Sequence, residues 1–235
     1  LSSMVSSLDH HRSLVMRAVE EIRRVDLVPK ILLDSRHRIV IFSCSTEGYD
    51  SPQPHPANYE DAQYEFFTDT QRNSSKWHWK LRPLVFTHHD KIKLARLHKT
   101  SPHKIFKDAD LAIWIDSNII IRGDISQMVQ EFVDSGADFG TVPHPYRQTI
   151  KEEARTLETK GKELNGFEQV TRYIDDGYPD EVLTETNFLM MNLKSGRTLA
   201  TLDEWSRQIL HYSSRDQLSF DYACWKSGAS KKHLP

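Results

Sequence analysis

The sequence predicts a single α/β domain with a mixed, mostly parallel sheet flanked by helices and a helix-rich carboxyl-terminal part. Through the first 145 residues, short apolar segments rich in β-branched residues alternate with segments of helical periodicity. Beyond that point helical patterns dominate, and neither an internal repeat nor a linker rich in Gly or Ser divides the chain. We therefore expect a lead-in helix within residues 1–30 and one domain over residues 31–235.

The first hundred residues predict the lead-in helix and the start of the sheet. Apolar residues recur at helical spacing over residues 8–25, and Pro29 ends that pattern. Residues 38–44 contain an apolar, β-branched run typical of a strand buried in a parallel sheet. The proline-rich residues 45–62 form a loop at the carboxyl end of that strand, where open α/β sheets bind ligands. The next expected elements are a strand at residues 64–68, a partly extended segment at 77–86 and a helix at 89–98.

The middle of the chain contains a second strong strand pattern. Residues 111–115 are apolar and run directly into Asp116, and another apolar triplet follows at residues 119–121. Asp124 is placed to cap a helix over residues 125–135. The remaining expected elements are strands at residues 137–142 and 186–193 and helices at residues 149–160, 166–176, 195–211 and 214–226.

Composition excludes several classes of protein. The 31 Lys and Arg nearly balance the 33 Asp and Glu, a net charge of −2, which argues against a protein built mainly to bind nucleic acid. No apolar run approaches the roughly 20 residues of a membrane-spanning helix. Two isolated cysteines, Cys44 and Cys224, predict neither a disulfide framework nor a zinc site. Because the chain begins at Leu1 rather than Met, we expect it to belong to a longer protein with other domains.

The segment Asp116-Ser117-Asn118 is the sharpest local feature. A carboxylate at the carboxyl end of a buried strand, followed two residues later by another oxygen ligand, can hold a divalent cation. Magnesium or manganese held in this way keeps positions for the phosphate oxygens of a nucleoside diphosphate. A capped turn between two strands would use the same residues, so spacing alone leaves both interpretations open.

A series of short segments, each weak alone, follow one another in a specific order. They are Phe67 to Asp69, Lys93 to His98, Pro102, Trp114 to Asn118, His144 to Arg147, Glu152 to Ala154, Gln169 to Tyr173, Gly177 to Pro179, Glu185 to Asn187 and Ser214 to Ser219. Over about residues 38–222 the sequence resembles nucleotide-sugar glycosyltransferases of the Rossmann-like GT-A fold. It resembles most closely the glycosyltransferase-like family of plant proteins involved in seed mucilage and turgor regulation, which also has bacterial members.

This resemblance implies a hexosyltransferase-like, retaining enzyme of polysaccharide biosynthesis. It would move a sugar from a nucleoside-diphosphate sugar to a glycan or glycoconjugate acceptor with the help of Mn²⁺ or Mg²⁺. Asp116 would be the main metal ligand, and Asn118 replaces the second acid of the general motif with a weaker ligand. The third ligand in such retaining enzymes as glycogenin is a histidine near the end of the domain, for which His233 is the first candidate and His211 the second. His233 could equally belong to a simple tail.

Three residues are the expected catalytic groups. Asp216 and Gln217 resemble the Asp-Gln pair that contacts the donor sugar in retaining glycosyltransferases, and a helix capped by Ser213 or Ser214 would present them in its first turn. An acid in a first turn is also favoured by the helix dipole alone. Glu185 is the second carboxylate that we expect near the sugar, where glycosyl transfer develops positive charge. Residues alone decide neither between these roles nor between inversion and retention.

The remaining candidates would bind the donor or the acceptor. Arg96 and Lys99 lie on the helix before the proposed metal strand and could bind the diphosphate, although a surface helix would carry the same charges. The strand ends next to the loop predict contacts with the nucleobase and ribose, and the segment after residue 142 predicts contacts with the sugar or acceptor. The residues concerned are Ser43, Ser45, Asp69, His144 and Arg147.

Two other functions fit some of the same residues. Asn118 is compatible with a catalytically silent module that binds a nucleotide or sugar within a larger glycan-assembly protein. The metal motif is also compatible with a metal-dependent nucleotidyltransferase. For location, the bacterial relatives imply the cytoplasm, at the inner face of a membrane, and the plant relatives imply the Golgi lumen.

Overall fold

A computed structural model of the chain describes residues 38–54, 62–70, 78–162 and 166–235. The lead-in helix expected over residues 8–25 lies outside these ranges. None of the helices within the described residues has the length and apolar composition that crossing a membrane requires.

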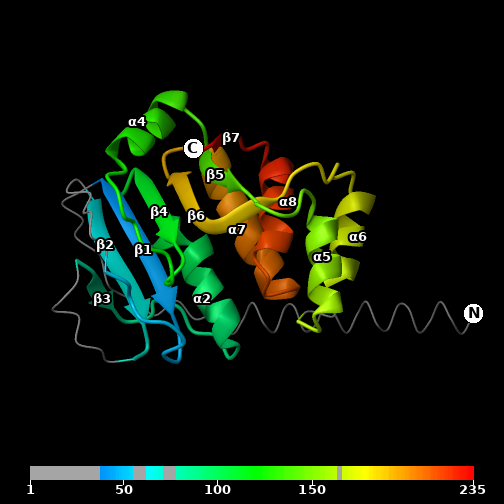
Figure 1. Ribbon diagram of the computed structural model, residues 1–235, viewed down its shortest axis with the longest axis horizontal. Helices are drawn as coiled ribbons and strands as arrows, with labels where there is room; N and C mark the ends of the chain where they lie inside the picture. The colour runs from blue at the N-terminus through cyan, green and yellow to red at the C-terminus, as the bar shows by residue number, and fades with distance from the viewer. Residues whose placement is uncertain (1–37, 55–61, 71–77, 163–165) are drawn as a thin grey trace, which may run out of the picture.

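The described strands form one seven-stranded sheet in the order β3-β2-β1-β4-β6-β5-β7 (Figure 1). Every pairing is parallel except those of β6, which runs antiparallel to β4 and β5. The carboxyl ends of β1, β2, β4 and β5 therefore share one edge of the sheet with the start of β6. The strands are β1 (Ile39–Ser45), β2 (Ala62–Thr68), β3 (Lys80–Arg82), β4 (Leu111–Ile115), β5 (Phe139–Pro143), β6 (Thr184–Asn192) and β7 (Lys231–His233).

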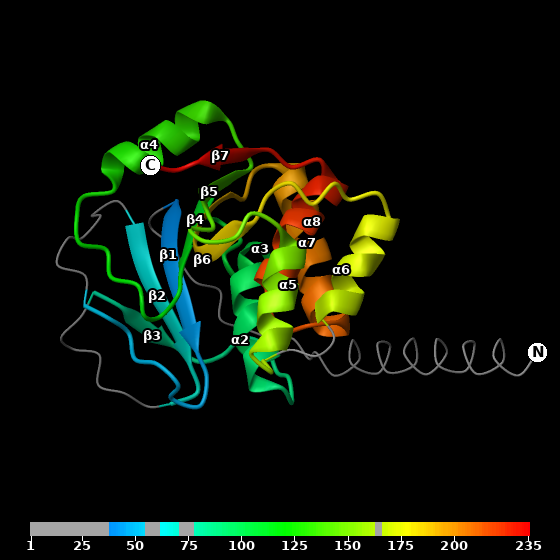
Figure 2. The ribbon, with the colours of Figure 1, turned by 45° about the vertical axis from the view of Figure 1, so that its right-hand side comes forward.

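Helices cover both faces of this sheet (Figure 2). Phe42 and Trp114 point into a core shared with α2, α7 and α8, whereas their neighbours Ile41 and Ile113 point into a second core under α4. This alternation is the period of two that a strand imposes. A third cluster joins α5 and α6 to α8. The helices are α2 (Lys91–Thr100), α3 (Pro102–Ile105), α4 (Ser126–Ser135), α5 (Ile150–Thr159), α6 (Gly166–Asp175), α7 (Gly196–His211) and α8 (Gln217–Ser227).

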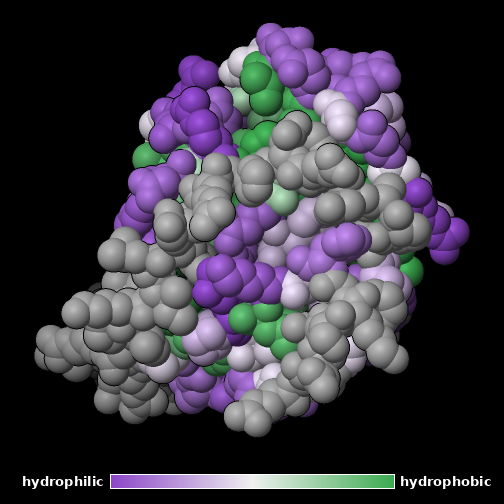
Figure 3. All heavy atoms as spheres, turned by 90° about the vertical axis from the view of Figure 1, so that its left-hand side faces the viewer, coloured by the Kyte–Doolittle hydropathy of each residue, from purple (hydrophilic) through white to green (hydrophobic). Residues whose placement is uncertain are grey.

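The expected α/β class with a mostly parallel sheet is confirmed, with local differences. The apolar triplet at residues 119–121 is not a strand. Of the expected 77–86 segment, the described residues 78–86 contain a strand only at residues 80–82, with an isolated bridge at Phe86. The short helix α3 and the edge strand β7 were not expected. Figure 3 shows the side of the molecule with the other edge strand, β3, where hydrophilic residues surround small hydrophobic patches.

The side chain of Asp138, just before β5, links this strand by hydrogen bonds to the start of α7 and to the residue before β7. Its buried carboxylate accepts hydrogen bonds from Ser195 at the start of α7, from Arg197 Nε at 3.0 Å, and from both the backbone N–H and the hydroxyl of Ser230 at 2.7 Å. Burial opposes ionisation, but the hydrogen bonds from Ser195 and Ser230 outweigh it and lower the pKa of Asp138. One ionised side chain therefore connects three elements that are remote in sequence.

We predict that Asp138→Ala lowers the free energy of unfolding by about 3 kcal/mol, because it leaves buried donors without an acceptor. A native pKa below the unfolded value adds stability above the unfolded pKa, and this stability is lost as the pH falls through the native pKa. The difference between wild type and variant should thus shrink below about pH 4 in urea titrations. The exposed Asp134→Ala in α4 is the control, and equal losses in both variants would contradict the role of Asp138.

Candidate active site

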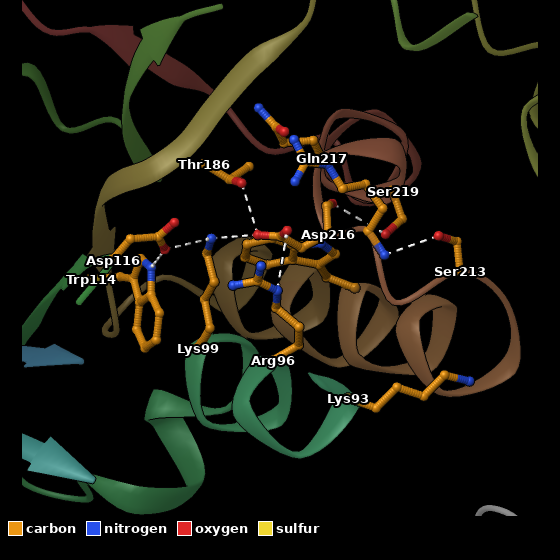
Figure 4. Close-up of polar contacts among 12 residues, drawn as sticks. Lys93, Arg96, Lys99, Trp114, Asp116, Thr186, Ser213, Asp216, Gln217 and Ser219 are labelled. Carbon is orange, nitrogen blue, oxygen red and sulfur yellow. Dashed lines mark hydrogen bonds and ion pairs between the residues drawn. The ribbon is translucent and has the colours of Figure 1, made fainter. Parts of the chain in front are cut away.

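Charged and polar side chains from four elements meet at the edge of the sheet where the carboxyl ends of β1, β2, β4 and β5 lie (Figure 4). Lys99 comes from the last turn of α2, Asp116 follows β4, Thr186 lies in β6, and Asp216 immediately precedes α8. The parallel strands deliver Asp116 to this edge, and the reversed direction of β6 brings the start of that strand beside it. The backbone N–H of Asp116 donates to the carbonyl of Asn187 at 2.8 Å, which joins the two strands at the site.

Asp216 is the most strongly paired carboxylate of the site. It is buried, accepts a hydrogen bond from Thr186 Oγ1 at 2.8 Å, pairs with Arg96 Nε at 3.3 Å and contacts the ammonium of Lys99. Burial alone would raise the pKa of Asp216, but the charges of Arg96 and Lys99 hold it well below its usual range. Asp216 is the N-cap residue of α8, where the helix dipole favours a negative charge, but its carboxylate makes no capping hydrogen bond and is instead bound by these side chains.

Lys99 has a side chain that is 0% exposed, so the surface-helix interpretation is wrong for this residue. Its Nζ lies 3.4 Å from Asp116 Oδ1 and between the rings of Trp114 and Trp205, at 5.3 Å and 5.8 Å from their centroids. A buried ammonium is stable only with charge partners, and here two carboxylates provide them. Lys99 and Arg96, with Asp116 and Asp216, make a group of zero net charge.

Asp116 is bound on one side and open on the other. Its Oδ1 accepts the indole N–H of Trp114 at 2.7 Å in addition to facing Lys99, and the side chain is 30% exposed. Figure 4 shows the second carboxylate oxygen pointing away from Lys99 and Trp114. Asn118 lies two residues further along an exposed turn.

A second cluster of polar side chains contains the catalytic candidates Gln217 and Glu185 and the binding candidate His144. Gln217 Nε2 donates to Glu185 Oε1 at 3.1 Å, and His144 Nε2 lies 3.6 Å from Glu185 Oε2. The backbone N–H groups of residues 146 and 147 donate to His144 Nδ1, and burial followed by the charge of Arg147 lowers the pKa of His144. Burial is also the largest influence on Glu185 and raises the pKa of its carboxyl group.

The sequence places Glu153 with His144 and Arg147 beside the sugar or acceptor, and the structure shows what its side chain contacts. The buried Glu153 of α5 accepts from Arg215 Nε at 3.1 Å and pairs with Arg147, so it holds two guanidinium groups beside Glu185 and Asp216. The contacts that the sequence did not indicate are those of the Thr186 hydroxyl and the Trp114 indole N–H. Arg96 and Lys99 could be predicted together, because residues three apart share one face of a helix.

The expected nucleotide-binding residues lie at the ends of β1 and β2. Ser45 Oγ accepts from the backbone N–H of Asp50 at 2.8 Å, and Asp69 Oδ1 accepts from that of Glu47 at 2.7 Å, so both shape the loop after β1. The buried Ser43 hydroxyl has no hydrogen-bond partner in the described part of the chain. A cavity of about 700 Å³ opens beside Asp69, between the end of β2 and the segment from β3 to residue 84.

The expected metal ligands are not brought together. His233 of β7 pairs with Thr141 of β5, which pairs with Leu189 of β6, which pairs with Trp114 of β4. Three strand spacings, about 14 Å, therefore separate the backbone of His233 from the strand that carries Asp116. His211 lies at the carboxyl end of α7, with Nδ1 3.1 Å from its own helix. Within the described residues, no three His, Cys, Asp or Glu side chains are arranged to hold a metal ion.

The donor set at Asp116 thus does not fit a divalent cation as these residues stand. Magnesium and manganese favour several carboxylate oxygens in a near-octahedral set. Here one oxygen of Asp116 is bonded to Trp114 and faces an ammonium. Beyond Asp116 the motif adds only the neutral side-chain oxygens of Asn118 and of Ser117, and the Ser117 hydroxyl donates to Asp50 Oδ2 at 2.6 Å.

No curated protein matches the chain in sequence. Among solved structures, it is similar to the bifunctional glycosyltransferase WbbM in its apo form, with 13% identity and a TM-score of 0.51 over 88% of this chain. The chain covers only 40% of the length of WbbM. This similarity shows that the chain has a GT-A-like fold, as the motifs predicted.

Two further solved structures are more distant in shape. The galactosyltransferase LgtC, in complex with donor and acceptor sugar analogues, has 11% identity and a TM-score of 0.48, with 83% of this chain and 72% of LgtC covered. Core-mannan synthase A from Aspergillus fumigatus, in its Mn/GDP form, has 10% identity and a TM-score of 0.47, with coverages of 88% and 75%.

The family comparison agrees with the resemblance that the motifs carry. The model of the family described as "TOD1/MUCI70, glycosyltransferase-like domain" matches residues 68–234, which is more than half of the chain and includes β4, β6 and the start of α8. The chain therefore belongs to the TOD1/MUCI70 family and carries its glycosyltransferase-like domain.

Proposed function

We propose that this chain is a glycosyltransferase that moves a sugar from a nucleoside-diphosphate sugar to a hydroxyl group of a glycan or glycoconjugate, in polysaccharide biosynthesis. The observation that carries the proposal is the convergence of Asp116, Asp216 and Glu185 with two cationic side chains at the ligand-binding edge of the sheet. Membership in a family described as glycosyltransferase-like supports the same conclusion.

Sugar transfer needs charges of both signs within a few ångströms. The departing diphosphate gains negative charge, which cations stabilise, while the anomeric carbon gains positive charge, which carboxylates stabilise. Arg96 and Arg215 retain 23% and 39% side-chain exposure and can meet a ligand, whereas Lys99 acts from behind the carboxylates. The site therefore offers both kinds of stabilisation without rearranging its buried ion pairs.

The two carboxylates near the sugar have different properties. Asp216 is ionised at any physiological pH because Arg96 and Lys99 hold its pKa low, so it is a fixed negative charge and a poor proton acceptor. Glu185 has a raised pKa and is the better base. With retention of configuration, as the resemblance implies, ionised Glu185 stabilises the cationic sugar. With inversion it accepts the proton of the acceptor hydroxyl.

The Mn²⁺ or Mg²⁺ that the resemblance implies would neutralise the diphosphate. Because the donor set at Asp116 does not fit such an ion, Arg96 and Arg215 of the chain itself provide that neutralisation.

The first test is binding. We predict that UDP, GDP or CDP raises the melting temperature of the wild type, since a ligand at 100 times its Kd adds about 2.7 kcal/mol of stability. Arg96→Gln should weaken this shift because it removes a cation from the site, and the exposed Arg155→Gln should not. The measurement is a thermal-shift panel run in EDTA and in Mn²⁺, and the absence of a shift with all three nucleotides in both conditions would contradict the proposal.

The second test is turnover with the donor that the panel identifies. Glu185→Gln should slow release of the nucleoside diphosphate by at least about 100-fold, because the group that must be ionised is lost. The wild-type rate should fall on the acidic side at a pH above 4.5, the usual value for glutamate, and the variant should lack this limb.

Exposed Glu181→Gln serves as the control for Glu185→Gln. Both variants should melt within a few degrees of the wild type, because Glu185 is only half-buried and its partner Gln217 can bond an amide. A Glu185→Gln enzyme with the wild-type rate and pH profile would exclude a catalytic role for Glu185.

A further inference from the structure

We propose that the ammonium group of Lys99 takes the place of a divalent cation at Asp116, so that the diphosphate of the donor binds this site without a metal ion. The part concerning the donor rests on the proposed function. The part concerning the cation rests on the chain alone and is tested separately below.

The first support is that Asp116, the only carboxylate of the Asp116-Ser117-Asn118 motif, already has two partners within the chain. Asp116 Oδ1 accepts from Trp114 Nε1 at 2.7 Å and faces Lys99 Nζ at 3.4 Å. Trp114 belongs to the fully buried strand β4, so this indole N–H is held in place by the core and has no alternative acceptor in solvent. A cation at Asp116 would have one carboxylate oxygen left to bind.

The second support is electrostatic. A dication on Asp116 Oδ2, about 2.1 Å away, would lie within about 8 Å of Lys99 Nζ, and like charges at that separation repel strongly in a partly buried site. Lys99 cannot turn away to solvent. Its side chain is 0% exposed and its Nζ lies between the rings of Trp114 and Trp205.

The third support is the charge balance of the cluster. Arg96 and Lys99 carry two positive charges and Asp116 and Asp216 carry two negative charges, so the group is neutral as it stands. A neutral cluster does not repel a diphosphate. Without Lys99 the same cluster would carry one net negative charge, which would favour a divalent cation and disfavour a diphosphate alone.

The decisive experiment compares the wild type with variants for Mn²⁺ binding in the absence of nucleotide. The electron paramagnetic resonance signal of free Mn²⁺ reports the binding. The wild type should bind no more Mn²⁺ than Asp116→Asn does. Lys99→Met keeps the length of the side chain and removes its charge, and it should bind Mn²⁺ at least about tenfold more tightly than the wild type.

Lys93→Met is the matched control for Lys99→Met. It lies on the same helix, but its Nζ donates to the carbonyl of Leu210 at 2.9 Å. It should bind Mn²⁺ as the wild type does, so a gain shared by both variants would overturn the proposal.

Calorimetry with the nucleoside diphosphate tests the second part. The wild type should bind it equally well in EDTA and in Mn²⁺, and abolition of binding by EDTA would overturn the inference. If no nucleoside diphosphate binds in either condition, the proposed function fails, and the Mn²⁺ titrations still decide the role of Lys99. If Lys99→Met does not fold, the comparison of wild type with Asp116→Asn decides: equal Mn²⁺ binding supports the inference and a loss in Asp116→Asn overturns it.

Discussion

The buried ammonium of Lys99 is the interaction on which the arrangement of this site depends. It joins the last turn of α2 to the carboxylate before α8 and to the carboxylate after β4. Without it, Asp216 would keep Arg96 as a charge partner, Asp116 would lose its ion pair, and the cluster would carry one uncompensated negative charge in a partly buried place. With it, three elements from distant parts of the chain have a reason to meet at one point of the sheet edge.

Much of the fold could be predicted because local pattern and burial agree. Residues 111–115 form a strand as expected, since an uninterrupted apolar run lies between Asp110 and Asp116. Where the local sequence pattern was weaker, hydrogen bonding to a neighbouring strand determined where a strand forms and ends. The strand β3 stops before Pro83, which has no N–H to donate. The polar Lys231–His233 segment becomes a strand only because an edge of β5 is available to it.

The candidate site could be predicted as a set of residues but not as a set of contacts. Sequence patterns indicated Asp116, Asp216, Glu185, Lys99 and Arg96, and the structure brings all five to one edge. They did not show that Lys99 is buried or that Asp216 precedes its helix instead of lying within it, because both facts depend on tertiary packing. They also did not indicate that His233 lies in a strand, since a three-residue edge strand leaves almost no periodic signal.

The sequence separation within the ion cluster has a consequence for the order in which the domain is made. Lys99 precedes Asp216 by 117 positions, and β7, which closes the sheet, follows later still. At a synthesis rate of about 5 to 20 residues per second, Asp216 is added roughly 6 to 23 s after Lys99. During that interval the nascent β1, β2 and β4 can already pair, and Asp116 is available to Lys99, but the buried partner Asp216 does not yet exist. Full burial of Lys99, and with it the dehydration of the candidate site, therefore has to wait until Asp216 has been added, late in the synthesis of the domain.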